Sequence, residues 1–427
     1  MVSLRFTVLF LVLFGVQWFL WRSLLLELLP KEEIKSVGVK IFIHAIPADL
    51  LSQFEKLEMN IDSCSLNAPW YTIEQRLPAL LQSPVGKPFL TDNSVEADFF
   101  LVPHHSTCLY HRCIHTSPFL HDNSTQAHRC RENVLAYMEA IQSWVERTAA
   151  WEHSGGRDHL YILPWDWASL LFDSDSDPER GVLLRNRIAS SIHLTLLGGL
   201  TIGDPATKNL AANEQLYLFA EDKDIVIPPW RDMSLALSLR PTVNERSILA
   251  YFRGTLASSS PTYSQGIRQR LISIGEADAR LLIKAEQSEF YWHELRHVRF
   301  ALCPRGWAGW SSRYYDALAS GAIPVVIADD WQPPFASDLS LRIKEEEVDN
   351  TLDILSAVSE EKIREIQANG ERLFKKVIWP DNAQPDGEAL NYLIDELSKR
   401  KQLYDSDPES DREDKKLTSD EEELNDL

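Results

Sequence analysis

Short runs of apolar residues recur along this chain, and several of them end at a proline. In the first half they occupy residues 39–45, 97–102, 159–163, 192–197 and 224–227, and in the second half residues 247–252, 298–303 and 323–328. Mostly apolar runs of this length are typical of strands that are buried on both faces of a parallel sheet. The sequence therefore predicts an α/β fold.

Segments with a helical spacing of apolar residues separate these runs. They cover residues 71–82 and 133–148 in the first half, and residues 265–272, 279–288, 312–320, 360–376 and 387–400 in the second. Pro228, Pro229 and Pro241 interrupt the chain between the two series. We expect two Rossmann-like domains, residues 37–235 and residues 236–404, which face each other across a cleft at the carboxyl ends of their strands.

The 427 residues carry a formal net charge of −20 that is unevenly distributed. Residues 405–427 contain eleven acidic residues and three basic ones, which predicts a solvated, disordered tail. The hydrophobic content of 44% is that of a globular protein. The acidic balance argues against a nucleic-acid partner, because nucleic-acid binders carry a basic face.

An uncharged apolar run covers residues 6–21, between Arg5 and Arg22. It is somewhat shorter than the roughly 20 residues that cross a bilayer core, although Arg22 could snorkel and lengthen it. A cleaved signal peptide is the alternative, but no clear small-x-small cleavage site follows the run. We expect residues 1–36 to form an uncleaved membrane anchor and a short stem.

Cysteines cluster in one window of the first half, at Cys64, Cys108, Cys113 and Cys130. Several histidines share this window, so disulfides and a zinc site are both considered. The Cys and His pairs interleave, whereas a zinc finger separates them by a dozen or so residues. This favours disulfides in an oxidising compartment, and the sequon at Asn123 agrees with a lumenal location.

Residues 300–335 carry the strongest chemical signal. A predicted strand leads through a loop with two glycines to a helix that opens at Ser312. The N–H groups of the first helical turn favour an anion, and Arg313 could hold a phosphate through two hydrogen bonds. Asp316 shares a helix face with both residues. A nucleotide site fits this pattern, and so does an ordinary βαβ unit with a serine cap and an Arg–Asp pair.

Five motifs, in order along the chain, resemble the signature of the exostosin-type glycosyltransferases, glycosyltransferase family 47. They are ADFFLVP at 97–103, DHLYILPWDW at 158–167, KDIVIPP at 223–229, AYFRG at 250–254, and the stretch 300–335 with FALCPRG, Arg313, Asp316-Ala317, GAIPV and PPF. Two positions depart from the family pattern: Cys303 follows Leu302 instead of preceding it, and Pro333 replaces a leucine. Neither change affects a polar residue.

This resemblance implies a GT-B fold, with an acceptor domain followed by a donor domain that holds most of the nucleotide-sugar. It also implies an inverting reaction without a metal or other cofactor. Positive side chains after the strands would stabilise the leaving diphosphate. The expected donor-binding residues are Arg253, Gly254, Arg305, Gly306, Ser312, Arg313 and Asp316, with the glycines permitting close backbone approach.

An inverting transfer needs a base for the acceptor hydroxyl, and the first domain should supply it. Asp166 matches the family aspartate and is the first candidate, while His104 and His105 are alternatives. The D-x-D spacing at Asp173, Asp175 and Asp177 could hold a metal, but it is more typical of a solvated loop. Tryptophans cluster around the motifs, and one or two of them are expected to contact the ligand: Trp165, Trp167, Trp307, Trp310 and Trp331.

The sequence thus predicts a Golgi glycosyltransferase, anchored by one span with its catalytic domains in the lumen, that uses a UDP-sugar and a glycan or glycoprotein acceptor. The endoplasmic reticulum and secretion are alternative locations, and a homo- or heterodimer is possible. The competing hypothesis is an inactive relative that binds glycans or serves as a partner subunit.

Overall fold

The structure is a computed structural model that describes residues 38–52, 69–116, 123–174, 176–199, 219–240, 246–256, 263–276 and 278–405. The predicted anchor, residues 1–36, lies outside this range, as does the predicted acidic tail apart from Asp405. Within the described part of the chain, no helix is long and apolar enough to cross a membrane.

The first half contains a parallel sheet with the strand order β1-β2-β3-β4-β5. Its strands are β1 (Ile41–Ile43), β2 (Phe99–Val102), β3 (His159–Leu163), β4 (Ile192–Thr195) and β5 (Ile225–Val226). Each strand falls within one of the five apolar runs. The helices of this half are α2 (Ala48–Ser52), α3 (Ile73–Gln82), α4 (Ser106–Thr116), α5 (Asn123–Val145), α6 (Ala149–Ser154), α7 (Pro178–Arg187) and α8 (Ser234–Ser238), with short 3₁₀ turns η3 (Pro69–Thr72), η4 (Lys87–Phe89), η5 (Ser94–Glu96) and η6 (Ala168–Phe172).

The second half contains another parallel sheet, with the order β10-β9-β8-β6-β7. Its strands are β6 (Ile248–Arg253), β7 (Leu281–Lys284), β8 (Val298–Pro304), β9 (Ile323–Ile327) and β10 (Leu341–Arg342). The remaining elements are α9 (Ile267–Gly275), α10 (Tyr291–Leu295), α11 (Ser312–Ser320), α12 (Ala336–Leu339), α13 (Thr351–Ser356), α14 (Glu360–Leu373) and α15 (Ala389–Asp405), with η7 (Tyr263–Gly266), η8 (Glu345–Asn350) and η9 (Phe374–Val377).

The helix predicted over residues 279–288 is wrong, because this segment contains the edge strand β7. Leu281 and Ile283 are buried while Leu282 and Lys284 are more exposed, which is the two-residue period of a strand. Parallel pairing of β7 with β6 fixes this conformation. The polar residues on both sides of the short apolar run had imitated a helical pattern.

Both sheets bury apolar side chains on both faces. Along β3, Leu160 and Ile162 pack in one core with helix α3, while Tyr161 and Leu163 pack in another with helix α5. In the second sheet, Phe252 of β6 packs in the core that includes α9, and Cys303 of β8 packs against α11. The observed α/β architecture with parallel sheets therefore confirms the predicted class.

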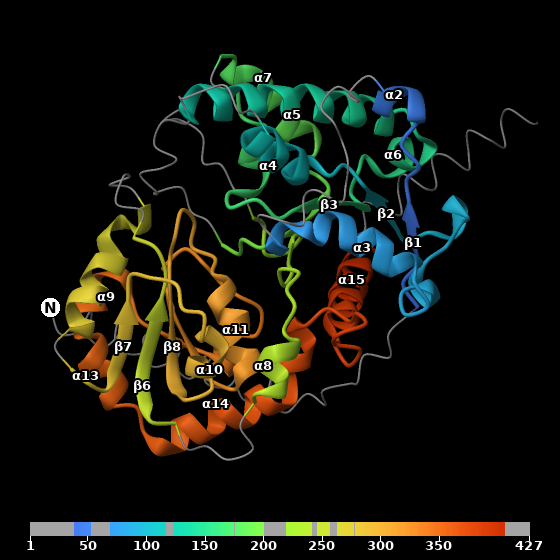
Figure 1. The fold of residues 1–427 in the computed structure, drawn as a ribbon. Helices are drawn as coiled ribbons and strands as arrows, with labels where there is room; N and C mark the ends of the chain where they lie inside the picture. The colour runs from blue at the N-terminus through green and yellow to red at the C-terminus, as the bar shows by residue number, and fades with distance from the viewer. Residues whose placement is uncertain are drawn as a thin grey trace, which may run out of the picture. The chain divides into compact units, whose positions relative to one another are not determined.

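The last helix, α15, packs on the sheet of the first half. Its Leu390, Leu393 and Leu397 are buried in the same core as Leu77 of α3, and Figure 1 shows α15, in red, beside α3 and β1. Both sheets belong to one compact unit that begins at Gly38. The domain boundary between residues 235 and 236 stays a prediction. Helix α15, which the sequence assigned to the second domain, packs in the core of the first sheet.

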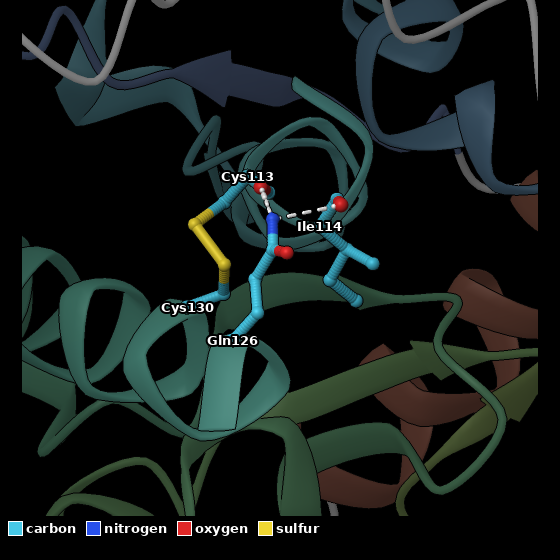
Figure 2. The surroundings of a disulfide bond; sticks show 4 residues. All are labelled: Cys113, Ile114, Gln126 and Cys130. Carbon is cyan, nitrogen blue, oxygen red and sulfur yellow. Dashed lines mark hydrogen bonds between the residues drawn. A yellow bond between two sulfur atoms is a disulfide. The ribbon is translucent and has the colours of Figure 1, made fainter. Parts of the chain in front are cut away.

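A disulfide joins Cys113 at the end of α4 to Cys130 in α5 (Figure 2). Gln126 reinforces this junction, since its Nε2 donates to the carbonyl oxygens of Cys113 and Ile114, each at 2.9 Å. Cys108 is also disulfide-bonded, whereas Cys64 lies outside the described residues. Among those residues no cluster of three or more His, Cys, Asp or Glu could hold a metal. Helix α5 begins at Asn123. Glycosylation of Asn123 stays a prediction.

Candidate functional site

A cavity of about 540 Å³ is lined by residues from both halves of the chain. The first half contributes Trp70, Tyr71, Asp166 and Arg231. The second half contributes the segments that follow β6, β7 and β8, residues of η7 and α9, and the first turn of α11. Seven of the predicted site residues line this cavity: Asp166, Arg253, Gly254, Gly306, Ser312, Arg313 and Asp316.

The start of α11 offers polar groups to this cavity. Ser311 occupies the N-cap position, but its side chain makes no capping hydrogen bond. Its hydroxyl has no partner among the described residues, although the residue is only 4% exposed. A buried hydroxyl without a partner is costly, and a ligand that bonds to it removes that cost. The helix start with Ser311 is therefore suited to an anion.

Two guanidinium groups, those of Arg313 and Arg268, flank this helix start. Arg313 Nε donates to the Arg253 carbonyl at 2.9 Å, and Arg268 Nε donates to the Arg305 carbonyl at 2.9 Å. Both lie against the Phe252 ring, with the guanidinium carbons 4.9 and 5.5 Å from its centroid. Neither has a carboxylate within ion-pairing distance in the described part of the chain.

The proximity of these cations is itself unfavourable. Burial and the charge of Arg313 lower the pKa of Arg268 to about 10, so Arg268 still carries its charge at neutral pH. Two positive charges that are held together without a carboxylate partner favour a ligand with at least two negative charges. We call Ser311, Arg313 and Arg268 the anion cradle.

Gly254 makes room for the cradle. A Cβ atom at this position would clash with the Arg313 guanidinium and would lie 3.0 Å from the Phe252 ring. A Cβ at Gly306 would lie 3.1 Å from Arg268 Nη2. The sequence suggested that these glycines let the backbone approach a ligand. In the structure, the space beside each glycine is occupied by a guanidinium.

The other cations that line the cavity are paired. Arg253 donates to Glu294 at 2.8 and 3.2 Å and to Glu286 at 2.7 Å. Arg231 Nε lies 2.6 Å from Asp316 Oδ1, and Asp316 Oδ2 accepts from the Tyr291 hydroxyl at 2.8 Å. Asp316 is thus held by protein groups at the cavity wall.

Asp166 lies just beyond the carboxyl end of β3. One of its oxygens, Oδ1, accepts from the Tyr71 hydroxyl at 2.7 Å and from Trp310 Nε1 at 2.8 Å. Burial raises the pKa of Asp166 above its usual value, and hydrogen bonds from Tyr71 and Trp310, together with the charge of Arg268, oppose this increase. A carboxylate with a raised pKa across from a cationic cradle is suited to accept a proton.

His104 and His105, the alternative bases, do not line the cavity formed by the described residues. His104 is fully buried, with Nδ1 3.8 Å from Glu74. Glu74 caps α4 by accepting from the backbone N–H groups of Thr107 and Cys108 at 3.0 to 3.2 Å. Burial lowers the pKa of His104 to about 3 and that of His105 to about 4. The geometry therefore favours Asp166.

Arg305 also lies apart from the cavity lining within the described chain. It is 4% exposed, and its guanidinium pairs with Asp330 at 3.2 Å and Glu345 at 3.0 Å. Its carbonyl oxygen accepts a hydrogen bond from Arg268 of the cradle. Of the three acidic residues considered for a metal, Asp173 is buried in an ion pair with Arg185, so it is not solvated, and Asp177 caps α7. Asp175 lies outside the described residues.

The tryptophans of the motifs have different surroundings. Trp307 and Trp310 line the cavity, with Trp307 41% exposed. Trp165 and Trp331 are buried in cores, and Trp167 packs on Trp165 with ring centroids 5.0 Å apart. Sequence reasoning did not select Arg268, Arg231 or Tyr71. The pattern of residues 265–272 indicated only an amphipathic helix, and no local motif marks Arg231 or Tyr71.

Acidification should destabilise the fold through its buried histidines. His105 has a native pKa of about 4 and an unfolded value near 6.5, so below pH 6.5 the unfolded chain binds more protons. Its contribution to stability is complete above pH 6.5 and falls by about 1.4 kcal/mol per pH unit down to about pH 4. Asparagine tolerates the left-handed φ of 52° at this position.

Urea unfolding of His105→Asn and the unsubstituted protein at pH 6.5 and pH 5.0 measures this contribution. Between these two pH values, the free energy of unfolding of the variant should fall by about 2 kcal/mol less than that of the unsubstituted protein. Equal losses in the two proteins would show that His105 is charged, or exposed, in the native state.

Gly254→Ala should displace the Arg313 guanidinium and weaken binding of a nucleoside diphosphate about tenfold, the loss of roughly one charge-assisted hydrogen bond. Gly370→Ala is the matched control, because nothing lies within 4 Å of a Cβ atom there. Isothermal titration with UDP compares the two variants. Equal affinities would contradict the assigned role of Gly254.

Comparison with known proteins places this chain in a family. Residues 35–358 match the model described as the Exostosin GT47 domain. "Probable glucuronosyltransferase GUT1" of Oryza sativa subsp. japonica is 27% identical over 376 residues, covering 85% of this chain and 81% of that protein. "Probable beta-1,4-xylosyltransferase IRX10L" of Arabidopsis thaliana is 26% identical over 377 residues, with 85% and 81% covered.

Proposed function

Because the Exostosin GT47 domain covers most of it, this chain belongs to the exostosin glycosyltransferases of family 47, and we propose that it transfers a sugar from a UDP-sugar to a glycan or glycoprotein acceptor with inversion at the anomeric carbon. The observation that carries the proposal is the position of Asp166 in the same cavity as the anion cradle. We also propose a GT-B arrangement, with the acceptor bound by the first half and the donor by the second.

The proposed reaction is a single displacement. The acceptor hydroxyl attacks the anomeric carbon, Asp166 takes the hydroxyl proton, and the bond to the diphosphate oxygen breaks with its electron pair on the leaving group. Arg268, Arg313 and Ser311 stabilise the negative charge that grows on the diphosphate. Because two guanidinium groups supply positive charge there, we propose that turnover needs no metal.

UDP-glucuronic acid and UDP-xylose are the first donors to test, since relatives carry the names of glucuronosyl- and xylosyltransferases. Release of UDP from the purified full chain, with glycan acceptors and with or without EDTA, measures turnover, and NMR of the product gives the anomeric configuration. Stabilisation by UDP without turnover on any donor and acceptor would instead support the partner-subunit hypothesis. A retained anomeric configuration would contradict inversion, and loss of turnover in EDTA would contradict the metal-free reaction.

We also propose a single-span Golgi protein with its catalytic domains in the lumen. The Cys113–Cys130 disulfide supports an oxidising compartment, and the apolar run at residues 6–21 supports an anchor. Digestion of the expressed protein with N-glycosidase tests lumenal exposure of Asn123, and an unchanged mobility would contradict its glycosylation.

A further inference from the structure

Two hydrogen-bond donors from distant parts of the chain meet on one oxygen of Asp166. Tyr71, in the turn η3 before α3, and Trp310, in the loop before α11, both donate to Oδ1 at 2.7 and 2.8 Å. No described residue donates a hydrogen bond to the other oxygen, Oδ2. The two donors therefore fix the carboxylate plane and leave Oδ2 available for a proton.

Both donors are themselves held in place. The Tyr71 ring is 9% exposed, stacks on His111 at 4.7 Å between centroids, and meets the Trp310 ring edge-on at 6.1 Å. Burial and the Asp166 charge raise the pKa of Tyr71 well above its usual value, so its hydroxyl stays protonated and donates. Trp310 has only an N–H to offer, so the direction of its bond is fixed as well.

Trp310 also links Asp166 to the anion cradle. It directly precedes Ser311, and Arg313 lies in the following helical turn. The segment that carries Ser311 and Arg313 of the cradle therefore also presents an N–H to the carboxylate of the other half. Placement of this segment sets both the charge at the leaving group and the orientation of the base.

We propose that Tyr71 and Trp310 are positioning residues, which hold Asp166 with Oδ2 toward the acceptor hydroxyl. This inference rests on the proposed function, in which Asp166 is the base. Among the described residues, Arg268 is the charged group that acts on Asp166 in addition to these two neutral donors. Because Arg268 remains when either donor is removed, the effect of the donors can be separated from that of the cationic cradle.

Trp310→Phe and Tyr71→Phe test the inference in the full chain. Each variant loses one donor that stabilises the carboxylate, so the acid limb of the pH profile of kcat should move to higher pH by about one unit. The value of kcat at its optimum should fall at least about tenfold, since the base is less well oriented. The Kd for UDP should stay within about twofold.

Trp167→Phe is the matched control. It removes an indole N–H one residue away from Asp166, and that N–H has no hydrogen-bond partner in the described part of the chain. Its pH profile should equal that of the unsubstituted protein. If Trp310→Phe and Tyr71→Phe match Trp167→Phe in profile and kcat while Asp166→Asn is inactive, the positioning role is overturned and the base stands.

Full turnover by Asp166→Asn would be a different result. It would contradict the role of Asp166 as the base, and with it the positioning role of Tyr71 and Trp310. Thermal unfolding of each variant identifies a folding defect. If one of the two donor variants is defective, the pH profile and kcat of the other test the positioning role. A kcat loss without a shift of the acid limb in that variant would indicate a merely structural role and would overturn the inference.

Discussion

Asp166→Asn should lower the rate of sugar transfer by a factor of about 10² to 10⁴, the usual contribution of a general base. The amide has nearly the shape of the carboxylate, and its oxygen can still accept from Tyr71 and Trp310. It cannot take the proton of the acceptor hydroxyl. The Kd for UDP should change little, because the hydroxyl and guanidinium groups of the cradle lie on other residues.

The measurement is kcat with saturating donor and acceptor, beside UDP titration of the same preparation. Asp177→Asn is a suitable control, since Asp177 caps α7 and asparagine is also a good N-cap. Activity of Asp166→Asn equal to that of the control would exclude Asp166 as the base. In the unsubstituted protein, activity should fall with acidity through a pKa above the usual aspartate value, because burial raises it.

The sequence predicted the sheets better than it predicted the site. Apolar runs such as residues 159–163 became strands with the same bounds, because burial on both faces leaves a continuous signal that needs no tertiary information. The edge strand β7 was the exception. It has one partner strand and polar neighbours along the chain, so its local pattern was ambiguous.

The site depended on contacts between distant residues. Arg305 follows a strand in a recognisable motif, yet its guanidinium turns to Asp330 and Glu345. Arg268 has no such motif, but α9 places it under Gly306 and beside Phe252. A motif shows which segment reaches the cavity. Whether an arginine near the cavity keeps a charge without a carboxylate partner depends on where the carboxylates lie in the folded protein. The spacing of residues along the chain does not contain this information.

Removing the cradle charges should weaken UDP binding more than any other change in the second half. A hydrogen bond to a charged group contributes about 1.5–3 kcal/mol, so Arg313→Ala and Arg268→Gln should each raise the Kd for UDP about 10- to 100-fold. The double variant should lose less than the product of the two factors. The two cations repel each other in the free protein, and removing one relieves that repulsion for the other.

Arg270→Gln is the matched control, since it lies in the same helix α9 but pairs with Asp349 on the surface. Calorimetry with UDP at one ionic strength measures the affinities of the four variants and of the unsubstituted protein, and unfolding without ligand reports on the fold. We expect Arg313→Ala to unfold at or above the temperature of the unsubstituted protein, because a cation without a carboxylate partner has been removed from the vicinity of Arg268. An unchanged Kd in both single variants would mean that the diphosphate binds elsewhere. An equal loss of UDP affinity in Arg270→Gln would show that the effect reflects only the net charge of the protein.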